Sequence, residues 1–316
     1  MNRKQLFGSI LLTLTALIWG VAFVAQRSGS DKIGAATFTS SRMTLAAVAV
    51  GLVSPIRDRF SRDTGDPGDE RSDKRRATVV GGCLCGVLLT VSTLLQQMGL
   101  EETSAGKAGF ITALYILIVP ILNLVLFRQK TSWQIWAAVA VGLSGMYLLC
   151  VKEGFSFARG DLLICGCALL FSGHILCCDR FVRRADPIRM SAIQFAVSAL
   201  LSAVIALLTE HPTWDQITSA AIPILYCGVL SGGVGYTLQM IAQRFTDPTV
   251  ASLLMSLESV FAALAGALIL KERMSVRELC GCIVLFAAIV AVQLPSPHIR
   301  SNRKEPLPAK DKEDPS

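Results

Sequence analysis

The sequence predicts an all-α integral membrane protein whose ten transmembrane helices form two inverted five-helix repeats around a central cavity. Composition, the length of the apolar windows and an internal repeat lead to this prediction. Of the 316 residues, 52% are hydrophobic and 17% are charged, whereas an average soluble domain has about 25% charged residues. Mean hydropathy is +0.54. This composition favours the lipid bilayer as the environment of the chain.

Ten apolar windows follow one another along the chain. A helix needs about 20 mostly apolar residues to cross the hydrocarbon core of a bilayer. Backbone N–H and C=O groups in lipid must be hydrogen-bonded internally, so we expect helices; strands of a barrel would alternate over about ten residues. The windows are 6–26, 33–53, 77–99, 107–127, 131–151, 160–178, 189–208, 218–241, 248–270 and 276–294.

An internal repeat relates the first five windows to the last five. A shift of 143 residues without a gap places Gln96 on Gln239 and Tyr115 on Glu258. Because five is an odd number of crossings, the second copy enters the membrane from the opposite face. Such inverted repeats place a binding site near the bilayer midplane, between the two copies.

The repeat divides the chain into two five-helix units and a tail. We expect the first unit at 1–153, with a flexible, polar cytoplasmic loop at 54–76, and the second unit at 154–295. Residues 296–316 are polar and of mixed charge, so we expect a disordered cytoplasmic tail.

The distribution of basic residues predicts the orientation. Most of the 30 lysines and arginines fall in links that share one side with the N-terminus. The positive-inside rule therefore places both termini in the cytoplasm, for a protein of the plasma (inner) membrane. The net charge of +7 follows this topology, so we expect lipid and no nucleic acid as a partner. Whether two copies form a homodimer is left open.

Two formal charges, Arg42 and Glu258, lie in the middle of their windows. A charge at the bilayer centre costs roughly 2.5–3.5 kcal/mol on insertion scales, so both should face protein or a wet cavity. They could bind substrate, with Arg42 as a counter-charge, or Glu258 could relay a coupling proton. Alternatively, the two side chains pair with each other, or with backbone carbonyls, as a structural element.

Other polar residues accompany this pair. Tyr115 is the repeat partner of Glu258, and Gln96 and Gln239 flank it, so these side chains are candidates for a divided central site or for interhelical hydrogen bonds. Trp19 is a candidate for cavity lining or for packing. The stretch "SGGVGY" (231–236) is rich in glycine, which destabilises a helix, so this window could bend or unwind.

His174 and Cys178 share a helix face and suggest a Cys–His nucleophile, but no third group that would orient them is evident. A substrate or proton role, or a structural hydrogen bond, is the better interpretation of His174. All ten cysteines lie in or at the ends of windows, and no His/Cys spacing matches a zinc site. We therefore expect small apolar filler, no metal and no cofactor.

Four stretches carry a resemblance to a known family: "WGVAFVAQRSG", "QQMGLEETSAGKAGFITALYILIVPI", "DRFVRRADPIRMSAIQF" and "TDPTVASLLMSLESVFAALAGALILKERMS". Their order and spacing resemble the drug/metabolite transporter superfamily, EamA type, over about Leu6 to Leu294. The resemblance implies ten helices, cytoplasmic termini and two inverted halves around a cavity. Where the family has Glu-Pro in its ninth helix, this chain has Glu258-Ser259, which puts the proline kink in doubt.

The resemblance implies a secondary active transporter of a small metabolite, amino acid or drug-like compound. Export is favoured on family grounds, by alternating access of the two halves. Two other classes stay open. A membrane scaffold or assembly protein would tolerate loss of the midplane polar residues. An intramembrane enzyme would need a nucleophile with a base, or a metal cluster, at one depth.

Overall fold

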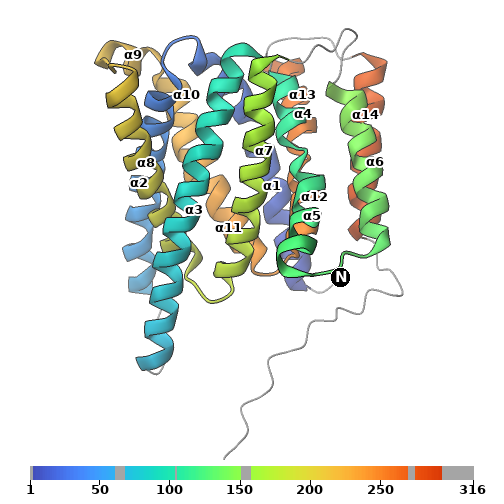
Figure 1. The fold of residues 1–316 in the computed structure, drawn as a ribbon, viewed down its shortest axis with the longest axis horizontal. Coiled ribbons are helices and arrows are strands. Elements are labelled where there is room, and N and C mark those ends of the chain that lie inside the picture. The colour runs from blue at the N-terminus through green and yellow to red at the C-terminus, as the bar shows by residue number, and fades with distance from the viewer. Residues whose placement is uncertain (1–2, 61–67, 104, 151–157, 270–274, 294–316) are drawn as a thin grey trace, which may run out of the picture.

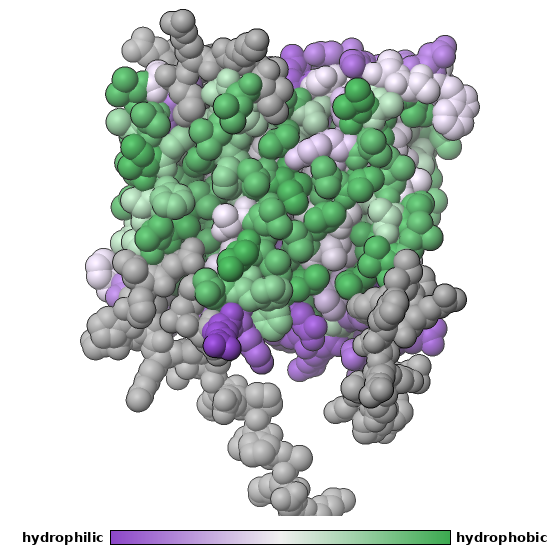
Figure 2. Space-filling view, turned by 180° about the vertical axis from the view of Figure 1, so that it is seen from behind, coloured by the Kyte–Doolittle hydropathy of each residue, from purple (hydrophilic) through white to green (hydrophobic). Residues whose placement is uncertain are grey.

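The computed structural model describes residues 3–60, 68–103, 105–150, 158–269 and 275–293. Every regular element in these ranges is a helix, and eight helical segments are long and apolar enough to cross a membrane. Most of the long helices run side by side (Figure 1). Hydrophobic residues cover the middle of the visible face, and hydrophilic residues lie at both of its ends (Figure 2). The chain is a multi-pass membrane protein.

The helices follow one another with short connections. In chain order they are α1 (Arg3–Ser30), α2 (Ala35–Phe60), α3 (Gly68–Glu102), α4 (Ala105–Thr112), α5 (Tyr115–Phe127), α6 (Trp133–Cys150), α7 (Arg159–Val182), α8 (Pro187–Thr209), α9 (Trp214–Ser219), α10 (Ala221–Leu225), η1 (Tyr226–Tyr236), α11 (Thr237–Gln243), α12 (Pro248–Met255), α13 (Glu258–Ile269) and α14 (Val276–Gln293).

The eight apolar segments fall on eight of the ten predicted windows. Helices α6 and α14 occupy the remaining two, 131–151 and 276–294. The number of spans, and their arrangement as inverted repeats, stay predictions.

The predicted flexible loop at 54–76 is wrong for its described parts, because α2 continues to Phe60 and α3 begins at Gly68. The polar segment from 68 to 76 contains no proline. Residues 61–67 and the predicted tail at 296–316 lie outside the described residues.

Two spans tighten at equivalent positions of the repeat. Between α4 and α5, the Leu114 N–H donates to the Ile111 carbonyl at 3.2 Å, an i→i+3 bond in place of i→i+4. Between α12 and α13, the Leu257 N–H donates to the Leu254 carbonyl, also at 3.2 Å and 143 residues later. Each tightened turn resembles 3₁₀ geometry. The second forms although Ser259 stands where the family has proline, so this tightened turn does not depend on proline.

The glycine-rich window does depart from α-helical geometry. It forms the π-helix η1 between α10 and α11. Glycine is needed there for close approach, since a Cβ on Gly228 would lie 2.8 Å from the carbonyl oxygen of Arg42 on α2. The backbone of η1 therefore packs directly against α2 beside Arg42.

Helices of the two predicted halves are interleaved. Helix α3 packs against α7 and α8, while η1 packs against α1 and α2. Helix α2 packs against α8, and α6 packs against α14 at one edge of the bundle (Figure 1). Exchanging the first five windows for the last five turns the α3 pairs into the η1 pairs. The same exchange leaves the α2–α8 and α6–α14 pairs unchanged.

The start of α2 is held by a carboxylate from the other half of the chain. Glu210, at the end of α8, accepts hydrogen bonds from the backbone N–H groups of Ala36 and Thr37, each at 2.8 Å, and from the Thr37 hydroxyl at 2.7 Å. These N–H groups have no partner within the helix, so the contact caps α2 and fastens it to α8.

Candidate functional site

The two tightened turns meet at the centre of the molecule. Tyr115 is the first residue of α5 and Glu258 is the first residue of α13. The Tyr115 hydroxyl donates a hydrogen bond of 2.9 Å to Glu258 Oε1, and both side chains are buried. The repeat partners are therefore in direct contact.

A cavity opens beside this pair. All seven residues predicted from the sequence line it: Trp19, Arg42, Gln96, Tyr115, His174, Gln239 and Glu258. The space left for the centres of water molecules is about 30 Å³. Pockets that hold drug-sized ligands measure about 300–1,000 Å³. In this conformation the cavity has room for water and would have to widen for a metabolite.

Arg42 enters the cavity from α2 and is 4% exposed. Its Nη1 donates to Gln26 Oε1 at 2.9 Å, and its guanidinium carbon lies 5.6 Å from the centre of the Phe38 ring. Its Nε and Nη2 have no protein acceptor. Among the described residues no ion pair joins Arg42 to Glu258, so their direct pairing as a structural element is not seen.

The two predicted glutamines differ in whether their amide groups have all their hydrogen-bond partners. Gln96 donates from Nε2 to the Thr112 hydroxyl at 3.3 Å. Gln239 donates from Nε2 to Gln243 Oε1 at 3.3 Å, but its own Oε1 is buried and has no donor. The cavity therefore presents one unpaired acceptor, from Gln239, in addition to the unpaired donors of Arg42.

Aromatic rings form one wall. Trp19 and Tyr236 stack at a tilt with ring centroids 4.6 Å apart, and both line the cavity. The Trp19 indole N–H donates to the Ser231 carbonyl of η1 at 3.2 Å. This bond fixes the plane of the indole, so the wall is a rigid apolar surface.

His174 borders the cavity from α7. Its Nε2 lies 2.9 Å from Gln194 Oε1, and Cys178 Sγ lies 3.6 Å from the same nitrogen. Gln194 is thus the orienting group that the sequence did not reveal. Cys178 is fully buried and does not line the cavity, so it is not placed to attack a substrate there.

Gly20 allows α1 to approach the Glu258 turn. A Cβ at this position would lie 2.7 Å from the Glu258 carbonyl oxygen and 2.8 Å from the Ala262 nitrogen. Both atoms belong to the backbone and cannot rotate away. We expect Gly20→Ala to lower the free energy of unfolding by about 1–3 kcal/mol, the usual cost of overpacking. Thermal unfolding of the purified variant and the unmodified protein in detergent measures this loss of stability.

Gly51→Ala is the matched control on α2, because a Cβ there meets nothing within 4 Å. It should leave stability unchanged or raise it by up to about 1 kcal/mol, the difference in helix propensity. Equal melting temperatures for the two variants would contradict the close packing inferred at Gly20.

Two important lining residues were missed. Gln26 follows Trp19 by seven residues, two helical turns, so its place on the same face was available from the sequence. Tyr236 follows Ser231 by five residues, the i→i+5 hydrogen-bond spacing of the π-helix that both lie in. A search with α-helical spacing selects Gly235 and passes over Tyr236.

Comparison with known proteins places this architecture in a family. The model described as the EamA-like transporter family matches residues 6–151 and 158–294. An uncharacterized transporter of Archaeoglobus fulgidus is 26% identical over 291 residues, which is 92% of this chain and 87% of that protein. A probable terminal-alkyne amino-acid exporter of Streptantibioticus cattleyicolor is 24% identical over 71% of this chain and 72% of that protein.

A solved crystal structure has the same fold, with a TM-score of 0.72 at 19% sequence identity over 91% of this chain and 96% of that chain. The family match extends across both predicted halves and includes every residue that lines the cavity. The chain belongs to the EamA-like transporter family and is a membrane transporter.

Proposed function

We propose that this protein is a secondary active exporter of a small zwitterionic metabolite of the amino-acid class, working by alternating access. One observation carries the proposal. Arg42 and Glu258 line the same buried cavity without forming an ion pair, so the cavity offers both signs of charge to a ligand. Buried charges are otherwise paired, and a zwitterion would pair both at once.

The unpaired atoms suggest how such a ligand would lie. The Nε and Nη2 groups of Arg42 are two donors of one guanidinium fork, which suits a carboxylate held by two parallel hydrogen bonds. Gln239 Oε1 and the Glu258 carboxylate are acceptors for an ammonium group. Trp19 and Tyr236 would contact the ligand's side chain. A relative named as an amino-acid exporter supports this substrate class.

Ten spans in two inverted halves would provide the alternating access. The 143-residue repeat, the equivalent turns at Leu114 and Leu257, and the exchange of helix pairs support this arrangement. The match of the family model in two parts, 6–151 and 158–294, also supports it. We place both termini in the cytoplasm, from the distribution of basic residues.

Contacts between the halves at the two ends of the molecule would then break in turn, one end at a time. At one end, the Glu210 carboxylate caps α2, and Lys107 of α4 pairs with Asp161 of α7. At the other end, the Asp186 N–H donates to the Thr78 hydroxyl at 3.0 Å. Opening one set while the other stays closed would expose the cavity to one side at a time.

Glu258 would couple transport to a proton. One carboxylate can hold either the substrate's ammonium group or a proton, so the two would bind alternately. An exporter built this way carries substrate out and a proton in. The Tyr115 hydroxyl, 2.9 Å away, keeps the carboxylate in place in both states.

The test is exchange in proteoliposomes that contain the purified protein. Vesicles loaded with a mixture of unlabelled amino acids should take up labelled zwitterions from that mixture, while the corresponding amides and N-acetyl derivatives, each lacking one charge, should not compete. Absence of exchange of any zwitterion would contradict the proposal. That outcome, with full membrane insertion, would favour a scaffold or assembly role instead.

A further inference from the structure

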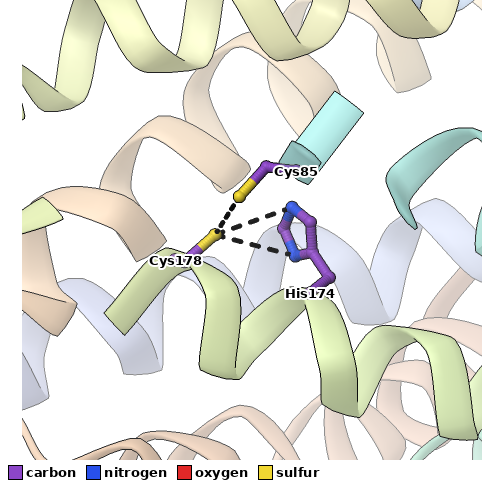
Figure 3. Close-up of side chains that lie close together, drawn as sticks. All are labelled: Cys85, His174 and Cys178. Atoms are coloured by element: carbon purple, nitrogen blue, oxygen red, sulfur yellow. Dashed lines mark hydrogen bonds between the residues drawn. The ribbon is translucent and has the colours of Figure 1, made fainter. Parts of the chain in front are cut away.

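A cluster of soft ligands lies next to the cavity and is not explained by the proposed transport site. Cys85 of α3 and His174 and Cys178 of α7 are all fully buried, and one ligand atom of each lies within 4.8 Å of the other two. Figure 3 shows the two sulfur atoms and the imidazole ring facing one another. We propose that Cys85, His174 and Cys178 form a binding site for Zn²⁺.

The spacing of the ligand atoms fits tetrahedral zinc. With Zn–S bonds of about 2.3 Å and Zn–N bonds of about 2.0–2.1 Å, tetrahedral angles place two sulfurs about 3.8 Å apart and sulfur and nitrogen about 3.6 Å apart. Here Cys85 Sγ and Cys178 Sγ are 3.6 Å apart. Cys178 Sγ lies 3.8 Å from His174 Nδ1 and 3.6 Å from Nε2. The ligand atoms of the third pair, Cys85 and His174, lie within 4.8 Å of each other, so binding would draw these two side chains closer together.

Gln194 prepares the imidazole for this role. When His174 Nε2–H donates to Gln194 Oε1, 2.9 Å away, the lone pair is left on Nδ1, which is available to a metal. Histidines that bind metals usually donate their other ring N–H to a fixed oxygen in this manner. The bond to Gln194 therefore selects a tautomer in which the His174 nitrogen is a ligand.

Charge balance favours zinc over other ions. Binding of Zn²⁺ would release one proton from each of the two thiols, and two thiolates with a neutral imidazole leave a centre with no net charge. Such a centre suits the apolar surroundings, which include Val182, Met190 and Met240. Mg²⁺ and Ca²⁺ prefer oxygen ligands, and Cu⁺ with two thiolates would leave a buried negative charge.

Occupation of this site would affect transport, a consequence that rests on the proposed function. Helix α3 belongs to the first predicted half and α7 to the second, so the metal would tie the two halves together. His174 also lines the cavity. We expect Zn²⁺ to slow exchange in proteoliposomes of the unmodified protein, and to slow it much less when Cys85 is replaced by serine.

The binding test needs no transport. The full-length protein in detergent is titrated with Co²⁺, whose thiolate charge-transfer absorption reports sulfur ligands, and the cobalt is then displaced with Zn²⁺. We expect one equivalent to bind to the unmodified protein, and at least tenfold weaker binding to Cys85→Ser and Cys178→Ser. Cys83→Ser on α3 and Cys280→Ser on α14 are controls, because both cysteines are exposed.

X-ray absorption of the zinc-loaded, unmodified protein is a second measurement that does not depend on how the variants fold. It should show two sulfur neighbours at about 2.3 Å and nitrogen at about 2.0–2.1 Å. Equal cobalt binding by Cys85→Ser and the unmodified protein, no binding by either, or a zinc shell without sulfur would each overturn the site. Such a result would mean that the cysteines serve only as apolar filler, and it would leave the transport proposal standing. Zinc binding that does not slow exchange would contradict only the inference that the metal restrains movement of the two halves.

Discussion

Arg42→Gln is expected to weaken binding of a zwitterionic substrate roughly 10- to 150-fold. The guanidinium has two donors with no protein acceptor, and each hydrogen bond to a charged group contributes about 1.5–3 kcal/mol. Glutamine keeps one amide N–H donor for the carboxylate, so the loss of one of the two bonds gives the stated range. Competition for uptake of a labelled amino acid into proteoliposomes measures the change in apparent affinity.

Arg42→Lys separates charge from geometry. Lysine keeps the positive charge but presents a point charge in place of the planar fork, so its affinity should lie between those of Arg42→Gln and the unmodified protein. Arg180→Gln is the control, since Arg180 is exposed and does not line the cavity. If Arg42→Gln transported with unchanged affinity, Arg42 would be a structural residue, held by Gln26 and the Phe38 ring.

The second large effect is expected from Glu258→Gln. The amide oxygen can still accept from the Tyr115 hydroxyl, so the local packing should survive while the charge is lost. A pH gradient across the vesicle membrane should then no longer drive substrate accumulation. Uptake with and without an imposed gradient, in the variant and in the unmodified protein, measures the coupling directly.

Glu102→Gln serves as a control for the removal of a carboxylate, because Glu102 is exposed at the end of α3. Its accumulation should match that of the unmodified protein. Gradient-driven accumulation by Glu258→Gln at the unmodified level would rule out Glu258 as the coupling group. Loss of substrate binding together with coupling is expected if ammonium and proton share the carboxylate.

The repeat relates Tyr115 to Glu258 and made both candidates for a divided central site, but their direct hydrogen bond came only from the structure. The residues that the repeat or mid-span polarity singled out all line one cavity. Their role in binding stays a prediction. Charged and amide side chains in apolar windows indicate positions in the protein interior. Lipid tolerates these groups poorly, so few other positions are open to them.

Contacts between distant, chemically ordinary residues could not be predicted. Cys85 meets Cys178 only because α3 packs on α7, and 93 residues separate them in the sequence. Spacing rules for zinc consider ligands that are close in sequence, so they find nothing here. Similarly, the glycines indicated an irregular eighth window but did not specify π geometry. The polarity of 68–76 indicated exposure to water and said nothing against a helix.

The tightened turns at Leu114 and Leu257 also change the direction in which each span presents its side chains. A 3₁₀ turn advances about 120° per residue and an α-helix about 100°, so every residue in the turn adds about 20° of rotation. Two such residues rotate the side chains of the following helix by roughly 40° about the helix axis, relative to a continuous α-helix. Helix α12 packs against α1 and α5, while α13 packs against α1 and α4. The same apolar span thus contacts α5 before the turn and α4 after it, because its winding changes at the turn.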